Sequence, residues 1–207
     1  MHLLLTDRLS CPRCGPEFGL ILLADRLVDR TVHDGVLGCP NCRDSFPVSD
    51  GFADLREPPR GPLAEGLAGE GGGRSDEEAR EGSRIVALLG IPRGPGTVAL
   101  VGAPARHAEL LVETVPELDA VVVDADTRGW PEHARVSRIV SSPGLPFFSR
   151  SLRGAVVDGR LGDAMIFEAA RVTALRCRTV VVSAPEGARR VLEEAGLRSS
   201  PRRTERS

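Results

Sequence analysis

The chain has 207 residues and a formal net charge of −2, and 41% of its residues are hydrophobic against 27% that are charged. This balance allows a folded core and excludes wholesale disorder, while the small net charge gives no sign of a polyanion-binding surface. All 27 basic residues are arginine and tyrosine is absent, which excludes a lysine Schiff base, a P-loop lysine and a phenolic acid. Any reaction would have to use carboxylates, His, Cys, Ser, Thr, backbone groups or a bound ion.

The apolar runs of the sequence are all much shorter than the ~20 residues of a membrane span. The longest, at residues 18–24, has the length of a strand. The amino terminus from Met1 to Leu5 is too short for a signal peptide and lacks its basic start. We therefore expect a cytoplasmic location and no membrane partner. Thiols stay reduced in that compartment, so the cysteines are interpreted as ligands or nucleophiles rather than as disulfides.

Composition divides the chain into two folded units, residues 1–56 and residues 84–198. Between them, residues 57–83 carry three arginines and seven acidic residues. Proline and glycine mark this segment at Pro58, Pro59, Pro62 and Gly71–Gly73. Such composition is typical of a flexible linker. Residues 199–207 are predicted to form a disordered tail.

Two C-x2-C pairs, Cys11–Cys14 and Cys39–Cys42, are the strongest signal in the sequence. The spacing lets both sulfurs of a knuckle face one point, and two knuckles complete a tetrahedral site for Zn²⁺. Gly15 can take the positive φ that the first knuckle needs. Four thiolates leave no open coordination position, so we predict a structural zinc ion. Its ligands are Cys11, Cys14, Cys39 and Cys42, and the weaker alternatives are a redox pair and His33 as a further ligand.

The first unit also resembles a known family over about residues 8–55. The segments that carry the resemblance are Leu9–Cys14, Asp34–Cys42 and Ser45–Phe52. They are similar to the zinc-ribbon methyltransferase-activator family, short proteins that partner enzymes methylating tRNA, rRNA and translation factors. The family has a conserved motif after its last cysteine. This chain matches that motif through Gly51 and Phe52, and has Ala53 where the family usually has proline. The resemblance implies a ribbon that acts through a protein partner. The alternative is a ribbon that is only a metal-stabilised structural addition to the chain.

In the second unit, short apolar runs alternate with helical patterns. Buried strands are predicted at residues 97–101, 120–124, 136–140, 154–158 and 179–183. Helices are predicted at residues 75–89, 107–115, 163–175 and 185–196, the first with Ser75 and Glu78 as a capping box. This alternation predicts an α/β fold, with a shortened parallel Rossmann-like sheet of about five strands and helices on both faces, beside the small β zinc ribbon.

Gly102 closes the first of these predicted strands and Asp124 closes the second. Residues 145–148 and 151–157 have the sequence pattern that precedes and forms the fourth strand in the enzyme class named next. Over roughly residues 84–197 the unit resembles Rossmann-like S-adenosylmethionine-dependent methyltransferases. In that class an acid at this place binds the ribose hydroxyls, so the resemblance implies Gly102 and Asp124 as cofactor-binding residues.

The first loop departs from the acid-x-Gly-x-Gly-x-Gly pattern of that class at Leu100, Pro104 and Arg106. Proline removes an N–H, and Arg106 puts a bulky cation where the backbone has to approach the cofactor closely. The sequence also has no pattern for the last two strands of the class. We therefore predict no S-adenosylmethionine binding in the usual pose and assign no catalytic residue.

Three carboxylates, Asp124, Asp126 and Asp158, fall at the carboxyl ends of predicted strands, where open α/β sheets bind ligands. The plainer interpretation is that they cap helices and solvate loops. His107 and His133 are interpreted as surface residues rather than as bases.

The absence of further strands predicts that the fifth strand is a sheet edge with unpaired backbone groups along Thr179–Val182. That edge is the expected contact for a protein partner or a homodimer mate, with the ribbon and the linker as other candidates to cover it. The leading hypothesis is a non-catalytic zinc-ribbon adaptor with a degenerate methyltransferase-like domain, a pseudoenzyme. The alternative is an active small methyltransferase. Direct nucleic-acid binding is not expected, because residues 1–56 have a net charge of −2 and the zinc thiolates add to it.

Overall fold

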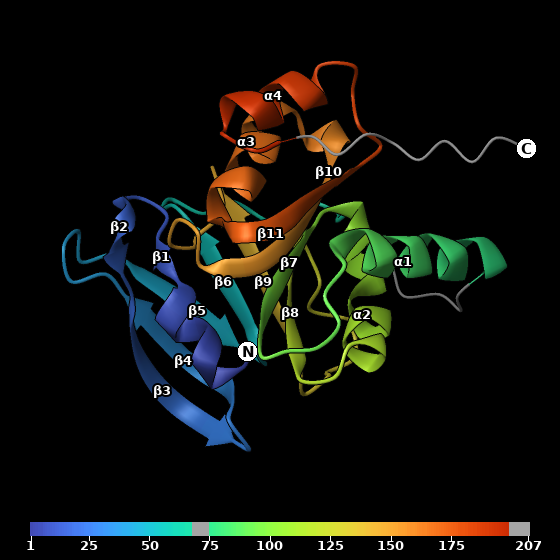
Figure 1. Ribbon diagram of the computed structural model, residues 1–207. Helices are drawn as coiled ribbons and strands as arrows, with labels where there is room; N and C mark the ends of the chain where they lie inside the picture. The colour runs from blue at the N-terminus through green and yellow to red at the C-terminus, as the bar shows by residue number, and fades with distance from the viewer. Residues whose placement is uncertain (68–74, 199–207) are drawn as a thin grey trace, which may run out of the picture.

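The computed structural model describes residues 1–67 and 75–198, and nine of its strands form one large sheet (Figure 1). The order in this sheet is β11-β10-β7-β8-β9-β6-β5-β4-β3, and β1 and β2 form a small second sheet. The strands are β1 (Ser10–Cys11), β2 (Gly15–Gly19), β3 (Ile21–Val28), β4 (Thr31–Gly38), β5 (Ser45–Ser49), β6 (Phe52–Arg56), β7 (Gly96–Val101), β8 (Leu118–Val123), β9 (Val136–Ser142), β10 (Leu152–Asp158) and β11 (Thr173–Val182). The predicted tail at 199–207 and the predicted linker glycines 71–73 lie outside the described residues.

Helices lie on both faces of the sheet. They are α1 (Asp76–Leu89), α2 (Ala108–Thr114), α3 (Asp163–Val172) and α4 (Ala188–Glu194), with 3-10 helices η1 (Leu3–Arg8), η2 (Ala103–His107) and η3 (Gly159–Leu161). Alternate side chains of β7 enter two different cores, because successive residues of a strand point to opposite faces. Val98 and Leu100 pack with α1 and α2, whereas Ala99 and Val101 pack with α3 and α4. Figure 1 shows the two helix pairs well separated.

The predicted sheet of about five strands is wrong in extent, because strands of the first unit continue it. Strand β6 pairs with β5 on one side and with β9 on the other, where Phe52 lies opposite Arg138. The pairing with β9 is parallel and that with β5 is antiparallel. Residues 52–56 are largely buried on both faces, unlike the neighbouring β5, whose residues alternate between exposed and buried. Neither this strand nor its distant partner was predicted from the sequence.

Strands β7 to β11 follow the doubly wound order, in which the first strand lies at the centre and the fourth lies beside it. The first-unit strands extend this sheet at β9, so they do not cover β11. Strand β11 is the terminal strand of the described sheet, as predicted for Thr179–Val182. It is longer than predicted and carries Leu175, whose exposed fraction is 72%.

The boundary between α3 and β11 differs from the predicted helix at 163–175. Helix α3 ends at Val172, and the hydroxyl of Thr173 donates to the Ala169 carbonyl at 2.7 Å. Arg176 has a φ of 65°, and the β10 pairing shifts register in this stretch. The β-branched Val172 and Thr173 favour leaving the helix here, against the helical periodicity. The predicted capping box of Ser75 and Glu78 at the start of α1 is confirmed.

Arg138 joins the first-unit strands to the rest of the sheet. Its side chain rises from β9, is 7% exposed and donates hydrogen bonds to the carbonyls of Thr127, Arg128, Trp130 and Asp50. Burial lowers the pKa of its guanidinium, and the carbonyl acceptors compensate for the lost hydration. One buried cation thus ties the β5–β6 turn to the β8–β9 loop.

Candidate metal centre and strand-end site

The four predicted zinc ligands meet at one point. The sulfurs of Cys11, Cys14, Cys39 and Cys42 all lie within 4.8 Å of one another. The Cys11–Cys42 and Cys14–Cys39 sulfur distances are 3.7 Å and 3.8 Å. A tetrahedron with metal–sulfur bonds of ~2.3 Å has edges of ~3.8 Å. The four cysteines can therefore hold a metal ion, and the donor set fits Zn²⁺.

Backbone geometry around the knuckles prepares this site. Gly15 has the predicted positive φ, at 90°, and Arg43 takes the matching left-handed conformation after the second knuckle, at 65°. Burial raises the pKa of the Cys11 thiol. At Cys39 burial acts in the same direction, but the amide groups of Cys42 and Asn41 outweigh it and lower the pKa to about 7. The second knuckle therefore favours the thiolate that a metal ion requires.

Gly102 and Asp124 also come together, at the carboxyl ends of β7 and β8. Gly102 has a φ of 74°, and its N–H donates to the Val123 carbonyl at 3.0 Å. The residue that lies between them is Leu67. Its N–H donates to Asp124 Oδ1 at 3.1 Å, and its Cδ1 lies 3.4 Å from the position that a Cβ on Gly102 would take. Sequence reasoning missed Leu67, because it falls in a segment that has linker composition.

The other two carboxylates bind their own loops. Asp158 caps η3 by accepting the Arg160 N–H at 2.9 Å, and it also binds the Arg160 guanidinium. Burial acts to raise the pKa of Asp158, but its hydrogen bonds with Arg160 outweigh it and the pKa lies below its usual value. Asp126 binds the amide and the guanidinium of Arg128 in the same way. These contacts favour the interpretation as caps and loop contacts.

The prediction that His107 lies on the surface is wrong. Its side chain is 5% exposed and lies against Gly82 of α1, where a Cβ would come within 3.0 Å of His107 Nδ1. The helical pattern places His107 at an open helix start, but η2 turns it inward, and the missing side chain at Gly82 makes room for it. Burial lowers the pKa of the imidazole, against the attraction of Glu81 at 3.4 Å.

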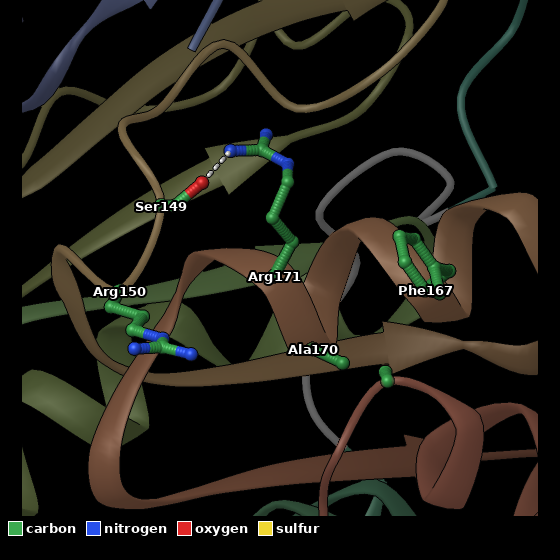
Figure 2. A pocket seen from close by; sticks show the side chains of 6 residues that line it. Ser149, Arg150, Phe167, Ala170 and Arg171 are labelled. Atoms are coloured by element: carbon green, nitrogen blue, oxygen red, sulfur yellow. Dashed lines mark hydrogen bonds between the residues drawn. The ribbon is translucent and has the colours of Figure 1, made fainter. Parts of the chain in front are cut away.

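A pocket of about 340 Å³ lies away from these sites (Figure 2). Its lining residues are Ser149, Arg150, Phe167, Ala170, Arg171 and Ala195. Figure 2 shows Arg171 directed toward Ser149, and its remaining donors bind Glu168 and two backbone carbonyls. All five N–H groups of this guanidinium thus have protein acceptors. Arg171 stabilises the loop of residues 145–149, which it contacts from α3. It has no N–H left to donate to an anion in the pocket.

Comparison with known protein families found no family model that matches the chain, and comparison with curated proteins found no significant match. Among the described helices, none has the length and apolar composition needed to cross a bilayer.

Proposed function

We propose that this protein is a non-catalytic adaptor, with a structural zinc ribbon and a degenerate methyltransferase-like domain, that acts through contacts with another protein. The observation that carries the proposal is the position of Leu67. In open α/β sheets an acid at the end of the second strand binds ribose hydroxyls. Here Asp124 instead accepts the Leu67 N–H, and the Leu67 side chain packs toward Gly102.

The segment after β7 supports the same proposal. Where a glycine-rich loop would bring its backbone to a cofactor, the chain forms η2 with Pro104 buried. Arg106 binds Glu78 of α1 at 3.1 Å, and Asp158 binds the amide and the guanidinium of Arg160. Groups that would face a cofactor in a working site are bound to the chain itself.

A titration with S-adenosylmethionine and its demethylated product tests the non-catalytic function. We expect no heat of binding at micromolar concentrations, because Asp124 accepts the Leu67 N–H and the Leu67 side chain lies beside Gly102. The alternative, an active methyltransferase, has one observation in its favour, which is that Gly102 and Asp124 do lie together. It predicts micromolar affinity that Asp124→Ala abolishes and Asp126→Ala keeps, and this outcome would contradict the adaptor proposal.

The proposed contact surface is the edge of β11 along Thr179–Val182, which pairs with no further strand among the described residues. Strand β11 is terminal in the described sheet, and Leu175 on the same strand is 72% exposed. Terminal strands can accept a strand from another chain through backbone hydrogen bonds. The partner class is a methyltransferase or a translation-related protein, with a second copy of this chain as the other candidate.

Affinity capture from the native host, scored for methyltransferases, tests this surface. We expect Leu175→Asp to reduce the captured partner at least tenfold, because a charge opposes docking of an apolar strand. The matched control is Leu23→Asp on β3, at the opposite edge of the sheet, where Leu23 is 68% exposed. Equal capture by wild type and Leu175→Asp would reject β11, and loss only with Leu23→Asp would move the contact to β3. Light scattering of the purified protein identifies a homodimer.

A further inference from the structure

Residues 61–67, called the strap below, are held at both ends over the carboxyl ends of the strands. At the first end Arg56, the last residue of β6, donates to the carbonyls of Gly61 and Pro62 at 2.9 Å and 3.2 Å. At the other end the Leu67 N–H donates to Asp124, and the Leu67 carbonyl accepts from Arg106 at 3.4 Å. The strap therefore runs from β6 to the ends of β8 and β7.

Gly66 makes the close approach to Asp124 possible. A Cβ at this position would lie 2.8 Å from Asp124 Oδ2 and 3.1 Å from its Cγ. The carboxylate is fixed in place, since Oδ1 also accepts the Ala125 N–H at 2.7 Å. A side chain at residue 66 would push the strap and Asp124 apart, so the contact depends on glycine.

We propose that the strap is an autoinhibitory element that occupies the ligand position of the α/β sheet. Its Leu67 N–H binds the carboxylate that a ribonucleoside diol would bind, and the Leu67 side chain, which is 40% exposed, lies with Cδ1 beside Gly102. This inference rests on the proposed function, in which the wild-type site binds no cofactor. It attributes the lack of cofactor binding to the strap, a segment that can be displaced.

Tethering makes the strap an effective competitor. Both ends are anchored, so the Leu67 amide meets Asp124 at an effective concentration on the order of millimolar. A free ligand has to exceed that concentration or bind much more tightly. Pro104 and Arg106, where the loop departs from the glycine pattern of methyltransferases, are compatible with the strap, since Arg106 donates a hydrogen bond to the Leu67 carbonyl.

A single added methyl group tests whether the contact holds the strap. Gly66→Ala is expected to speed hydrogen exchange at the Leu67 amide, and cleavage by a glutamyl endopeptidase after Glu65, at least tenfold. Gly61→Ala is the matched control, because a Cβ there meets nothing within 4 Å. Equal rates in the two variants would overturn the proposal. Zinc content and circular dichroism establish that each variant is folded. Leu67→Ala is a second release variant at an exposed position, which keeps the amide and removes the side chain that lies beside Gly102.

Titration with adenosine as the probe tests whether the strap excludes a ligand. We expect saturable binding by Gly66→Ala or Leu67→Ala that is at least tenfold tighter than binding by wild type and Gly61→Ala. Equal binding by all four proteins, or binding by none of them, overturns the autoinhibitory role. S-adenosylmethionine binding by the wild-type protein contradicts the proposed function instead, so the two failures are distinguishable.

Discussion

Replacing Cys39 by serine is expected to remove zinc from the protein and to unfold the strands nearest the cysteines, β1 to β4 (residues 10–38). Three remaining cysteines cannot close a tetrahedral site, so the two knuckles and the strands next to them lose the ion that holds them together. Structural zinc contributes about 10–16 kcal/mol in zinc-finger peptides, whereas whole domains are stable by only about 5–15 kcal/mol. The loss is therefore expected to exceed what the remaining ribbon contacts supply.

Metal analysis and hydrogen exchange measure this effect together. The wild-type protein should contain one zinc per chain, and Cys39→Ser should contain none. Amides of β4 should then exchange rapidly, while those of β7, at the centre of the α/β unit, stay protected. Cys177→Ser is the matched control, since Cys177 lies outside the cluster. Full zinc content in Cys39→Ser would show that the ligands are assigned wrongly.

Arg138→Met is expected to destabilise the protein by about 3 kcal/mol, because it leaves buried carbonyls without donors. The guanidinium binds four carbonyls, one of them, on Asp50, in the β5–β6 turn. Methionine fills a similar volume but donates no hydrogen bond, so the effect comes from lost polar contacts rather than from a cavity. The loss should loosen the junction between β6 and β9 first.

Urea unfolding at neutral pH measures this loss against Arg128→Met. Arg128 lies in the β8–β9 loop that Arg138 contacts, but its side chain is 60% exposed and is bound to Asp126, so its removal should cost less than about 1 kcal/mol. Equal midpoints for the two variants would contradict the assigned role of Arg138. Hydrogen exchange along residues 52–56 then reports whether β6 separates from β9.

Local patterns carried the prediction of most elements of the α/β unit and of the four-cysteine cluster. Apolar runs such as residues 97–101 indicate buried strands because both faces of a parallel sheet are covered. The C-x2-C spacing indicates a shared point because it is a property of the knuckle itself. Glycine at residue 15 marked a real left-handed turn. In each case the cause lies within a few residues of the signal.

Features that depend on residues distant in the chain could not be predicted from the sequence. The pairing of β6 with β9 joins two segments, and the apolar pattern of neither one predicts the other as its partner. His107 is buried only because α1 has Gly82 opposite it. The contact of Leu67 with Asp124 was missed because an amide donor exists at every residue type except proline. Composition could indicate that residues 57–83 are not a core element, but it could not indicate where they lie.

The parallel pairing of β6 with β9 has a consequence for the order of folding. Phe52 and Arg138, opposite each other in this pair, are 86 residues apart, whereas the hairpins of the ribbon close over a few residues. Loop closure over such a span is entropically costly, and contacts of this kind form late on the folding path. We therefore expect the ribbon hairpins and the α/β strands to form first and their junction to form in the slow step. Until then two bare strand edges coexist in one chain, so a high local concentration of chains during synthesis favours exchange of ribbons between neighbours.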